Sequence, residues 1–201
     1  MDYLVQSNRR VNGKMVLEGE LIDAKGKKVV VIGGGDTGSD CVGTANRQGA
    51  SCVVQIEVLP KPSSCRTSEC PWPRYPNLLK MTSSHEEGCQ RRWLVSTKRF
   101  IGEKGHVVKL QCETGNEAFE IEADLVILAI GFLHPEHSGL LADLGVEFDN
   151  RSNVKTGADY KTSVEKVFSA GDMRRGQSLL VWAISEGRGA ALSIDRYLMG
   201  G

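Results

Sequence analysis

The chain has 201 residues, 40% of them apolar and 25% charged, a composition that excludes a predominantly disordered protein. Its 25 basic and 25 acidic residues give a formal net charge of zero, so no overall field attracts nucleic acid or an anionic membrane. The longest apolar run, residues 125–130, or 125–133 if Gly131 is counted, is far shorter than the roughly 18 residues of a membrane span, and the N-terminus lacks the apolar segment of a secretion signal. We therefore expect a cytoplasmic protein with no nucleic-acid or membrane partner.

The first predicted elements form a βαβ unit. Residues 1–26 are polar and weakly patterned, which indicates a lead-in or linker. The β-branched run 28–32 is typical of a strand buried on both faces of a parallel sheet. A helix is predicted over 36–48 and a second strand over 53–58, and these three elements together have the length of an ordinary βαβ unit.

A proline-rich stretch and several short strands follow. Residues 59–77 contain five of the six prolines, which predicts a long irregular loop of the kind that usually serves a function or an interaction. Three antiparallel strands are predicted over 93–101, 106–112 and 118–121. The wholly apolar residues 125–130 predict another central strand.

The last predicted elements are a short strand over 167–170 and a long helix over 177–199. One face of this helix carries, at three- and four-residue steps, Leu180, Ile184, Gly187, Ala191, Ile194 and Leu198. The order of elements up to residue 130 predicts an α/β fold, a Rossmann-like, three-layer nucleotide-binding domain with an antiparallel insertion.

A glycine-rich turn lies between the first strand and its helix. In the pattern Gly33-x-Gly35-x-x-Gly38 the first glycine allows a tight turn, the second lets a pyrophosphate approach the backbone, and the third lets helix and strand pack closely. Free N–H groups at the helix start would hold the phosphates. The alternative is a glycine-rich turn without a ligand. The candidate binding residues are Gly33, Gly34, Gly35, Asp36, Thr37 and Gly38.

An acidic residue, Glu57, lies 19 residues beyond Gly38 at the end of the second predicted strand. A carboxylate there accepts hydrogen bonds from ribose hydroxyls and repels a 2′-phosphate, which favours NADH. Lys61, Arg66 and Arg74 in the following loop could instead reach a 2′-phosphate. The choice between NADH and NADPH is therefore open from the sequence.

A second constellation lies near the C-terminus. Gly171 and Asp172 end a short apolar stretch, and Gln177 and Ser178 open the predicted long helix. The arrangement suggests a carboxylate that reaches a chain of hydroxyls while the helix start faces an electron-rich ring or an anion. By itself this signal is weak, and an aspartate in a turn with Ser178 as an ordinary N-cap is then the favoured explanation.

Cysteine and histidine positions give no metal-binding pattern. The six cysteines lack any C-x-x-C pair and are interpreted as reduced thiols. His85 and Cys89 lie four residues apart, and His134 and His137 three apart, but no set of three or four ligands has consistent spacing. We expect no metal site, and we name no catalytic acid, base or nucleophile.

Long motifs in this sequence resemble a known family, the small (β) subunit of glutamate synthase. The three most specific are VFSAGDMRRGQSLLVWAISEGR at 167–188, VIGGGDTGSDC at 31–41 and DLVILAIGF at 124–132. Shorter matches are EVLPKP at 57–62, PWP at 71–73, SHEEG at 84–88 and STKRFIG at 96–102. The resemblance extends over nearly the whole chain.

The resemblance implies a domain organisation in which a pyridine-nucleotide domain is inserted into an FAD domain. It assigns 27–130 to an NAD(P)H-binding domain and 131–201 to the C-terminal portion of an FAD-binding domain, with Gly131 at the return between them. It also implies that Asp172 contacts the ribityl chain of the flavin. The backbone around Gln177 and Ser178 would face the pyrimidine edge of the flavin ring.

The resemblance further implies an enzyme, an NAD(P)H-dependent flavin oxidoreductase that passes hydride from NADPH or NADH to FAD. In the family the electrons then cross iron–sulfur centres to a large subunit that makes glutamate from 2-oxoglutarate and glutamine-derived ammonia. Family members carry cysteine clusters and an earlier glycine-rich βαβ unit before the matched region, so we expect the large subunit and that N-terminal half as partners; a homodimer is a further option.

Two alternatives stay open from the sequence. In the first, the chain is a nucleotide-binding module that holds no flavin and is catalytically silent alone. In the second, it is an interaction domain in which the proline-rich loop 59–77 contacts a partner and the glycine-rich turn is vestigial.

Overall fold

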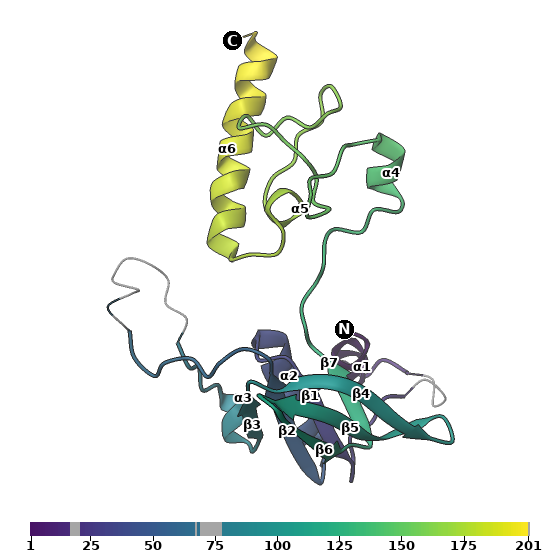
Figure 1. Ribbon diagram of the computed structural model, residues 1–201. Coiled ribbons are helices and arrows are strands. Elements are labelled where there is room, and N and C mark those ends of the chain that lie inside the picture. Colours follow the sequence, from purple (N-terminus) through teal and green to yellow (C-terminus); the bar gives the residue numbers. More distant parts are fainter. Residues whose placement is uncertain (17–20, 67, 69–77, 201) are drawn as a thin grey trace. The chain divides into compact units, whose positions relative to one another are not determined.

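The computed structural model describes residues 1–16, 21–66, 68 and 78–200. The chain divides into two compact units, Met1–Gly131 and Phe132–Gly201 (Figure 1). All named strands of the described residues belong to the first unit. Among the same residues, no helix combines the length and the hydropathy that crossing a membrane requires.

The first unit is built around a parallel sheet of strands in the order β3-β2-β1-β7. Their bounds are β1 (Lys28–Ile32), β2 (Cys52–Glu57), β3 (Gln90–Trp93) and β7 (Leu125–Leu128). Helix α2 (Asp36–Arg47) connects β1 to β2, which pair in parallel, so the predicted βαβ unit is confirmed. Parallel strands end at one edge of the sheet, and the loops at that edge are where such folds bind ligands.

Side chains alternate across the parallel sheet and fill a core on each face. Val29 and Val31 pack with helices α1 (Asp2–Val11) and α2. Val30 points the other way, against an antiparallel sheet of β4 (Ser96–Glu103), β5 (His106–Thr114) and β6 (Glu117–Glu122). The order of layers is therefore helices, parallel sheet and antiparallel sheet, which confirms the predicted α/β, three-layer fold with an antiparallel insertion.

The lead-in expected over 1–26 is instead partly folded onto the first unit. It contains helix α1, whose Tyr3 is 4% exposed and donates from its hydroxyl to Oε1 of Gln48 at 3.0 Å. Ala24 is fully buried in the same core. Because only a few apolar side chains carry this contact, the sequence pattern of the segment is weak.

The strand expected over 93–101 is divided between two sheets. Trp93 ends β3, an edge strand of the parallel sheet, and β4 begins at Ser96. Between them Leu94 adopts a positive φ of 57° and its N–H donates to the carbonyl of Leu59. This left-handed residue turns the chain away from the parallel sheet.

Much of the predicted proline-rich loop lies outside the described residues. This includes Cys70, Trp72, Arg74 and three of its prolines. The described part is irregular as expected, apart from a single bridge between Ser63 and Leu78 and the short helix α3 (Ser83–Glu86) that follows the loop.

The described residues of the second unit, 132–200, form a small core and three helices, α4 (Leu140–Leu144), α5 (Asp172–Arg175) and α6 (Leu180–Met199). The core is formed by Leu141, Val146 and Val154, with Phe148, Val164 and Val167 packed against it. The strand expected over 167–170 is reduced to one isolated bridge, from Phe168 to Lys161.

Helix α6 differs from its prediction in its start and in its buried face. It begins at Leu180, so Gln177 and Ser178 precede it. Its buried residues are Glu186 and Ala190, whereas Leu180 and Leu198, from the predicted apolar face, are 76% and 73% exposed. Most of the apolar stripe of α6 is thus exposed in the described part of this unit, although Ile194 is half-buried.

Candidate functional site

The glycine-rich turn lies at the carboxyl end of β1, and its glycines have distinct roles. Gly33 has a φ of +123°, and a Cβ there would lie 2.2 Å from the carbonyl oxygen of Ala129. A Cβ on Gly38 would lie 2.3 Å from the Gly33 oxygen and 2.8 Å from Nε2 of Gln55. A Cβ on Gly35 would meet nothing within 4 Å. Gly33 and Gly38 are therefore required by packing, while Gly35 leaves the outer side of the turn open.

The start of helix α2 faces this open side. Gly35 is its N-cap and makes no side-chain cap hydrogen bond, and Asp36 and Thr37 form the exposed first turn. Uncapped N–H groups and the positive end of the helix dipole favour an anion at this position. A cavity of about 460 Å³ lies here. Its lining includes Gly33, Gly34, Gly35, Asp36, Thr37, Glu57 and Gly131.

Glu57, at the end of β2, lies across the turn. Its Oε2 accepts a hydrogen bond from the N–H of Gly34 at 2.7 Å, and its Oε1 accepts one from the N–H of Leu59 at 3.0 Å. A Cβ on Gly34 would lie 2.7 Å from Oε2, so this glycine lets the carboxylate approach. The structure thus brings Glu57 together with the glycine-rich turn, as the spacing in the sequence predicts.

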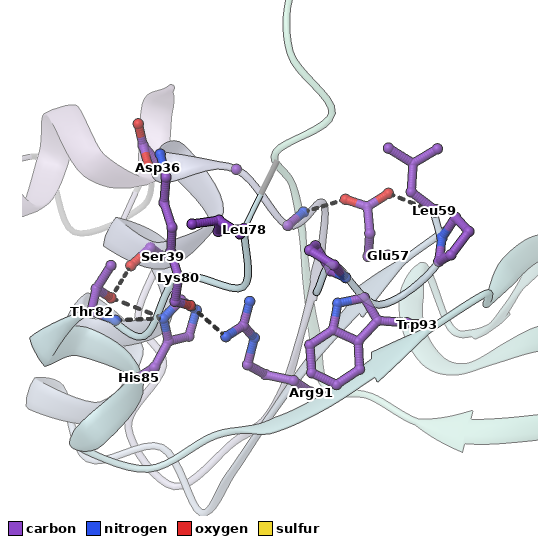
Figure 2. A pocket seen from close by; sticks show the side chains of 14 residues that line it. Asp36, Ser39, Glu57, Leu59, Leu78, Lys80, Thr82, His85, Arg91 and Trp93 are labelled. Carbon is purple, nitrogen blue, oxygen red and sulfur yellow. Dashed lines mark hydrogen bonds between the residues drawn. The ribbon is translucent and has the colours of Figure 1, made fainter. Parts of the chain in front are cut away.

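A second cavity, of about 300 Å³, lies beside Glu57 and contains basic groups (Figure 2). Lys80, Arg91 and Trp93 are part of its wall. The Arg91 guanidinium lies 5.0 Å from the centre of the Trp93 ring, and the Lys61 ammonium lies 5.2 Å from the same ring. Two cations are therefore held at one indole beside the candidate ribose-binding carboxylate.

Of the three cations that the sequence suggests for a 2′-phosphate, one is placed at the site. Lys61 lies over Trp93, as described above. Arg66 is exposed in the irregular loop, and Arg74 lies outside the described residues. Arg91, which sequence reasoning missed, joins Lys61 because β3 returns beside β2.

Two buried polar residues beneath the turn were also missed by sequence reasoning. Gln55 is 2% exposed and donates from Nε2 to the Gly33 carbonyl at 2.9 Å. His85 of α3 is 6% exposed and its Nε2 lies 2.9 Å from Oε1 of Gln55. Burial, with a smaller contribution from Arg91, holds the pKa of His85 below its ordinary value. The sequence did offer one indication of such a site, the polar Gln55 in the middle of the otherwise apolar strand β2.

The residues predicted near the C-terminus meet in the second unit. Asp172 is the first residue of α5, and its Oδ1 accepts hydrogen bonds from the N–H and the hydroxyl of Ser178 at 3.2 and 3.3 Å. Gln177 donates from its amide to the carbonyl of Phe132. Asp172, Gln177 and Phe132 line a cavity of about 390 Å³. Three predicted residues of the second constellation, Asp172, Gln177 and Ser178, are therefore neighbours.

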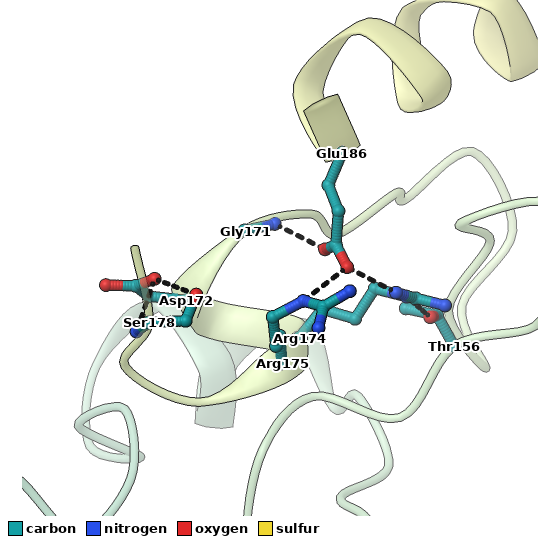
Figure 3. Close-up of polar contacts among 7 residues, drawn as sticks. All are labelled: Thr156, Gly171, Asp172, Arg174, Arg175, Ser178 and Glu186. Carbon is teal, nitrogen blue, oxygen red and sulfur yellow. Dashed lines mark hydrogen bonds and ion pairs between the residues drawn. The ribbon is translucent and has the colours of Figure 1, made fainter. Parts of the chain in front are cut away.

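A buried carboxylate, Glu186 of α6, holds the turn that carries Asp172 (Figure 3). It is 3% exposed and its Oε2 accepts the N–H of Gly171 at 2.9 Å. Its Oε1 accepts hydrogen bonds from Arg174 at 2.8 Å and Arg175 at 2.9 Å. Burial opposes the charge, but the Gly171 N–H and the two guanidinium groups outweigh it and keep the pKa of Glu186 below its ordinary value.

Comparison with known proteins identifies the family. The sequence pattern of the pyridine nucleotide-disulphide oxidoreductases matches residues 5–187. The chain belongs to this family. A solved structure of similar fold is the thioredoxin reductase of T. acidophilum, which is 26% identical with a TM-score of 0.61, over 85% of this chain and 52% of that one.

Within the family the chain is similar to glutamate synthases, which confirms the resemblance seen in its motifs. The glutamate synthase [NADPH] small chain of Mycobacterium tuberculosis is 50% identical over the whole of this chain and 44% of that protein. The corresponding Bacillus subtilis protein is 38% identical over 100% of this chain and 45% of that protein. The glutamate synthase [NADH] of Schizosaccharomyces pombe is 39% identical, over 100% and 11%. The chain spans less than half the length of these relatives.

Proposed function

We propose that the first unit binds NADPH or NADH at the glycine-rich turn. The observation that carries this proposal is that the glycines of the turn have different surroundings. Gly33 and Gly38 have no room for a side chain, while Gly35 is open toward a cavity of about 460 Å³ at the start of α2. This volume is in the ordinary range for small-molecule sites. The pyrophosphate would accept hydrogen bonds from the first N–H groups of α2.

Glu57 and the cations beside it would bind the adenosine end of the nucleotide. A carboxylate at the end of the second strand suits the ribose hydroxyls. Lys61 and Arg91, held at Trp93, supply positive charge for a 2′-phosphate. Relatives of this chain are named for NADPH in bacteria and for NADH in yeast, and the proposed site contains groups suited to each nucleotide.

We further propose that the second unit contributes part of an FAD site. The cavity of about 390 Å³ beside Asp172 and Gln177 fits this assignment, because it offers a carboxylate and an amide beside an apolar wall. Asp172 would accept hydrogen bonds from the ribityl hydroxyls, and the backbone near Ser178 would face the pyrimidine edge of the ring. When bound, the flavin supplies the capacity to accept hydride from the nicotinamide.

In this proposal the chain's own residues bind and orient the cofactors and transfer no proton themselves. Glu186 fixes the Gly171 turn, and the uncapped end of α2 would bind the phosphates. The names of the relatives support a role as the electron-input part of a glutamate synthase, with a large subunit and an N-terminal iron–sulfur and FAD half as partners. Glutamate formation from glutamine and 2-oxoglutarate would then occur on the large subunit.

A second candidate function is nucleotide binding without flavin. This candidate is favoured by the exposed apolar stripe of α6. An apolar surface left exposed indicates that the second unit by itself forms only part of a flavin site. The purified chain separates the two functions by its absorbance spectrum. A yellow protein with flavin absorbance supports the oxidoreductase, and a colourless protein that binds nucleotide supports the second candidate.

The test of nucleotide binding is a calorimetric titration of the chain with NADPH and with NADH. We expect binding of at least one of them, and loss of that binding in Gly35→Glu, because the new carboxylate fills the space left for the phosphates and repels them. If the parent chain binds neither nucleotide, the proposed function is wrong.

A further inference from the structure

Residues Gln55 and Glu57 of β2 together fix a single peptide unit of the glycine-rich turn. They are two positions apart, so their side chains point to the same face of the strand. Gln55 Nε2 donates to the carbonyl of Gly33, and Glu57 Oε2 accepts the N–H of Gly34. This carbonyl and this N–H are the two ends of one peptide plane. Its orientation is therefore held from both sides.

A nucleotide would disturb only one of these two anchors. If Glu57 turns its oxygens to ribose hydroxyls, its bond to the Gly34 N–H is weakened. Gln55 is buried beneath the turn and does not line either cavity beside it. Its hydrogen bond to Gly33 is then the contact that keeps the peptide, and the adjoining Gly35, in the binding geometry.

The protonation state of His85 determines whether Gln55 can serve this role. Because the Gln55 amide donates to a carbonyl from Nε2, its Oε1 faces His85 and needs a donor there, which is Nε2–H of the imidazole. On the other side, the Thr82 N–H points at Nδ1 of His85 at 3.3 Å, and the Thr82 hydroxyl lies 2.9 Å from it. Nδ1 must therefore be an acceptor. Only the neutral imidazole with its proton on Nε2 satisfies all of these contacts.

We propose that Gln55 and His85 are positioning residues for the nicotinamide nucleotide, and that protonation of His85 lowers nucleotide affinity by disturbing the peptide between Gly33 and Gly34. The inference rests on the proposed nucleotide site. A proton on Nδ1 would face the Thr82 N–H, donor against donor, so the imidazolium must move and Gln55 loses its partner.

Charged groups of both signs lie around His85. Arg91 of β3 and Lys80 of the preceding loop line the cavity that His85 also lines. The acidic groups there are Asp36 of α2 and Glu57 of β2, and Glu86 follows His85 on α3. Burial and Arg91 prevail and lower the pKa of His85, so affinity should fall only as the pH drops below the ordinary histidine value.

The experiment measures the affinity of the full chain for NADP⁺ and NAD⁺, which withstand acid better than the reduced forms, at about pH 7.5 and about pH 5.5. In the parent chain we expect affinity to fall toward the acidic value by less than about tenfold, because the lowered pKa leaves His85 incompletely protonated there. His85→Gln should bind more weakly than the parent at the higher pH and lose most of this pH dependence. Gln55→Leu should lose about tenfold at the higher pH, because the Gly33 carbonyl loses its donor.

Matched controls are His106→Gln and Gln111→Leu, two exposed positions on β5. Both should keep the parent's affinity and pH profile. Since the 2′-phosphate of NADP⁺ titrates near a pH of about 6, each variant is compared with the parent on the same ligand. If His85→Gln follows the parent's pH profile, or the parent's affinity is the same at both pH values, the inference is wrong. If the parent binds neither nucleotide at either pH, the proposed function itself fails.

A measurement on the parent alone covers the case in which a variant does not fold. Nitrogen NMR of the labelled chain should show the Nε2–H tautomer of His85, and the amide signal of Gly34 should shift along the same titration curve as the ring. A His85 that carries its proton on Nδ1, or a Gly34 signal that ignores the His85 titration, overturns the inference.

Discussion

The two units of this chain differ in how completely each builds its own site. In the first, cores cover both faces of the parallel sheet, and the glycine-rich turn is framed by β1, β2, α2 and the residues that follow β7. In the second, three residues form the buried core, and the longest helix leaves its apolar stripe exposed. A turn anchored on the core of its own unit can keep its geometry alone, whereas a turn on a small core depends on a few polar contacts, chiefly those of Glu186.

The largest expected effect tests the self-contained first unit. Gly33→Ala should destabilise it by about 3 kcal/mol or more, because the residue has a positive φ and its new Cβ overlaps the Ala129 carbonyl. Gly35→Ala is the matched control, since its Cβ meets nothing within 4 Å, and its stability should fall by only about 1 kcal/mol or less, the cost of alanine at the N-cap of α2. Residue-resolved hydrogen exchange measures both. Equal stabilities for the two variants would contradict the packing described for Gly33.

The next effect tests the dependence of the second unit on one carboxylate. Glu186→Gln should destabilise it by about 3 kcal/mol, because two arginines lose the charge that partners them. Hydrogen exchange of the Gly171 amide should rise, and any flavin bound to the parent should be lost. Asp195→Asn, an exposed change on the same helix, is the control and should leave both readouts unchanged.

The pH dependence of the same contact has a definite sign. The folded unit lowers the pKa of Glu186 below the value in the unfolded chain, so the carboxylate contributes its full stability above the unfolded pKa of about 4.3. This contribution is lost as the pH falls through the folded value. The stability difference between parent and Glu186→Gln should therefore shrink on acidification, and a difference that grows would show that the charge is not stabilising.

The smallest effect concerns the two faces of α6. Ala190→Lys should destabilise the second unit by about 2 kcal/mol, since Ala190 is 7% exposed and the longer charged side chain has no room. Leu198→Lys, at 73% exposure, should change its stability by less than about 0.5 kcal/mol. Circular dichroism during thermal unfolding compares them. A destabilised Leu198→Lys would mean that the stripe is already packed in the isolated chain.

Local patterns predicted the first βαβ unit well because each of its elements has a strong signal. The run of valines gives β1 with the predicted bounds, and Glu57 lies at the turn as its spacing indicated. Helix α1 escaped prediction because its contact with the core depends on two apolar side chains, Tyr3 and Leu4. The start of α6 was misplaced because the Ser178 N–H bonds to the Asp172 side chain outside the helix.

Local sequence patterns could not predict contacts between residues that are far apart in the chain. Gln55 and His85 are 30 residues apart, and only the return of the chain through α3 to β3 brings them together. The division of residues 93–101 between two sheets depends on the positive φ of Leu94, which nothing in its neighbours' hydropathy indicates. Tertiary geometry of this kind fixes the polar contacts beneath the turn.

Trp93, in the wall of the cavity beside Glu57, has an optical consequence. The emission of an indole overlaps the absorption of a reduced nicotinamide ring, so a reduced nucleotide bound close by would quench the fluorescence of Trp93 by energy transfer. The protein therefore carries a native fluorophore at the edge of its proposed binding site, and occupancy could be followed by light without attaching a dye.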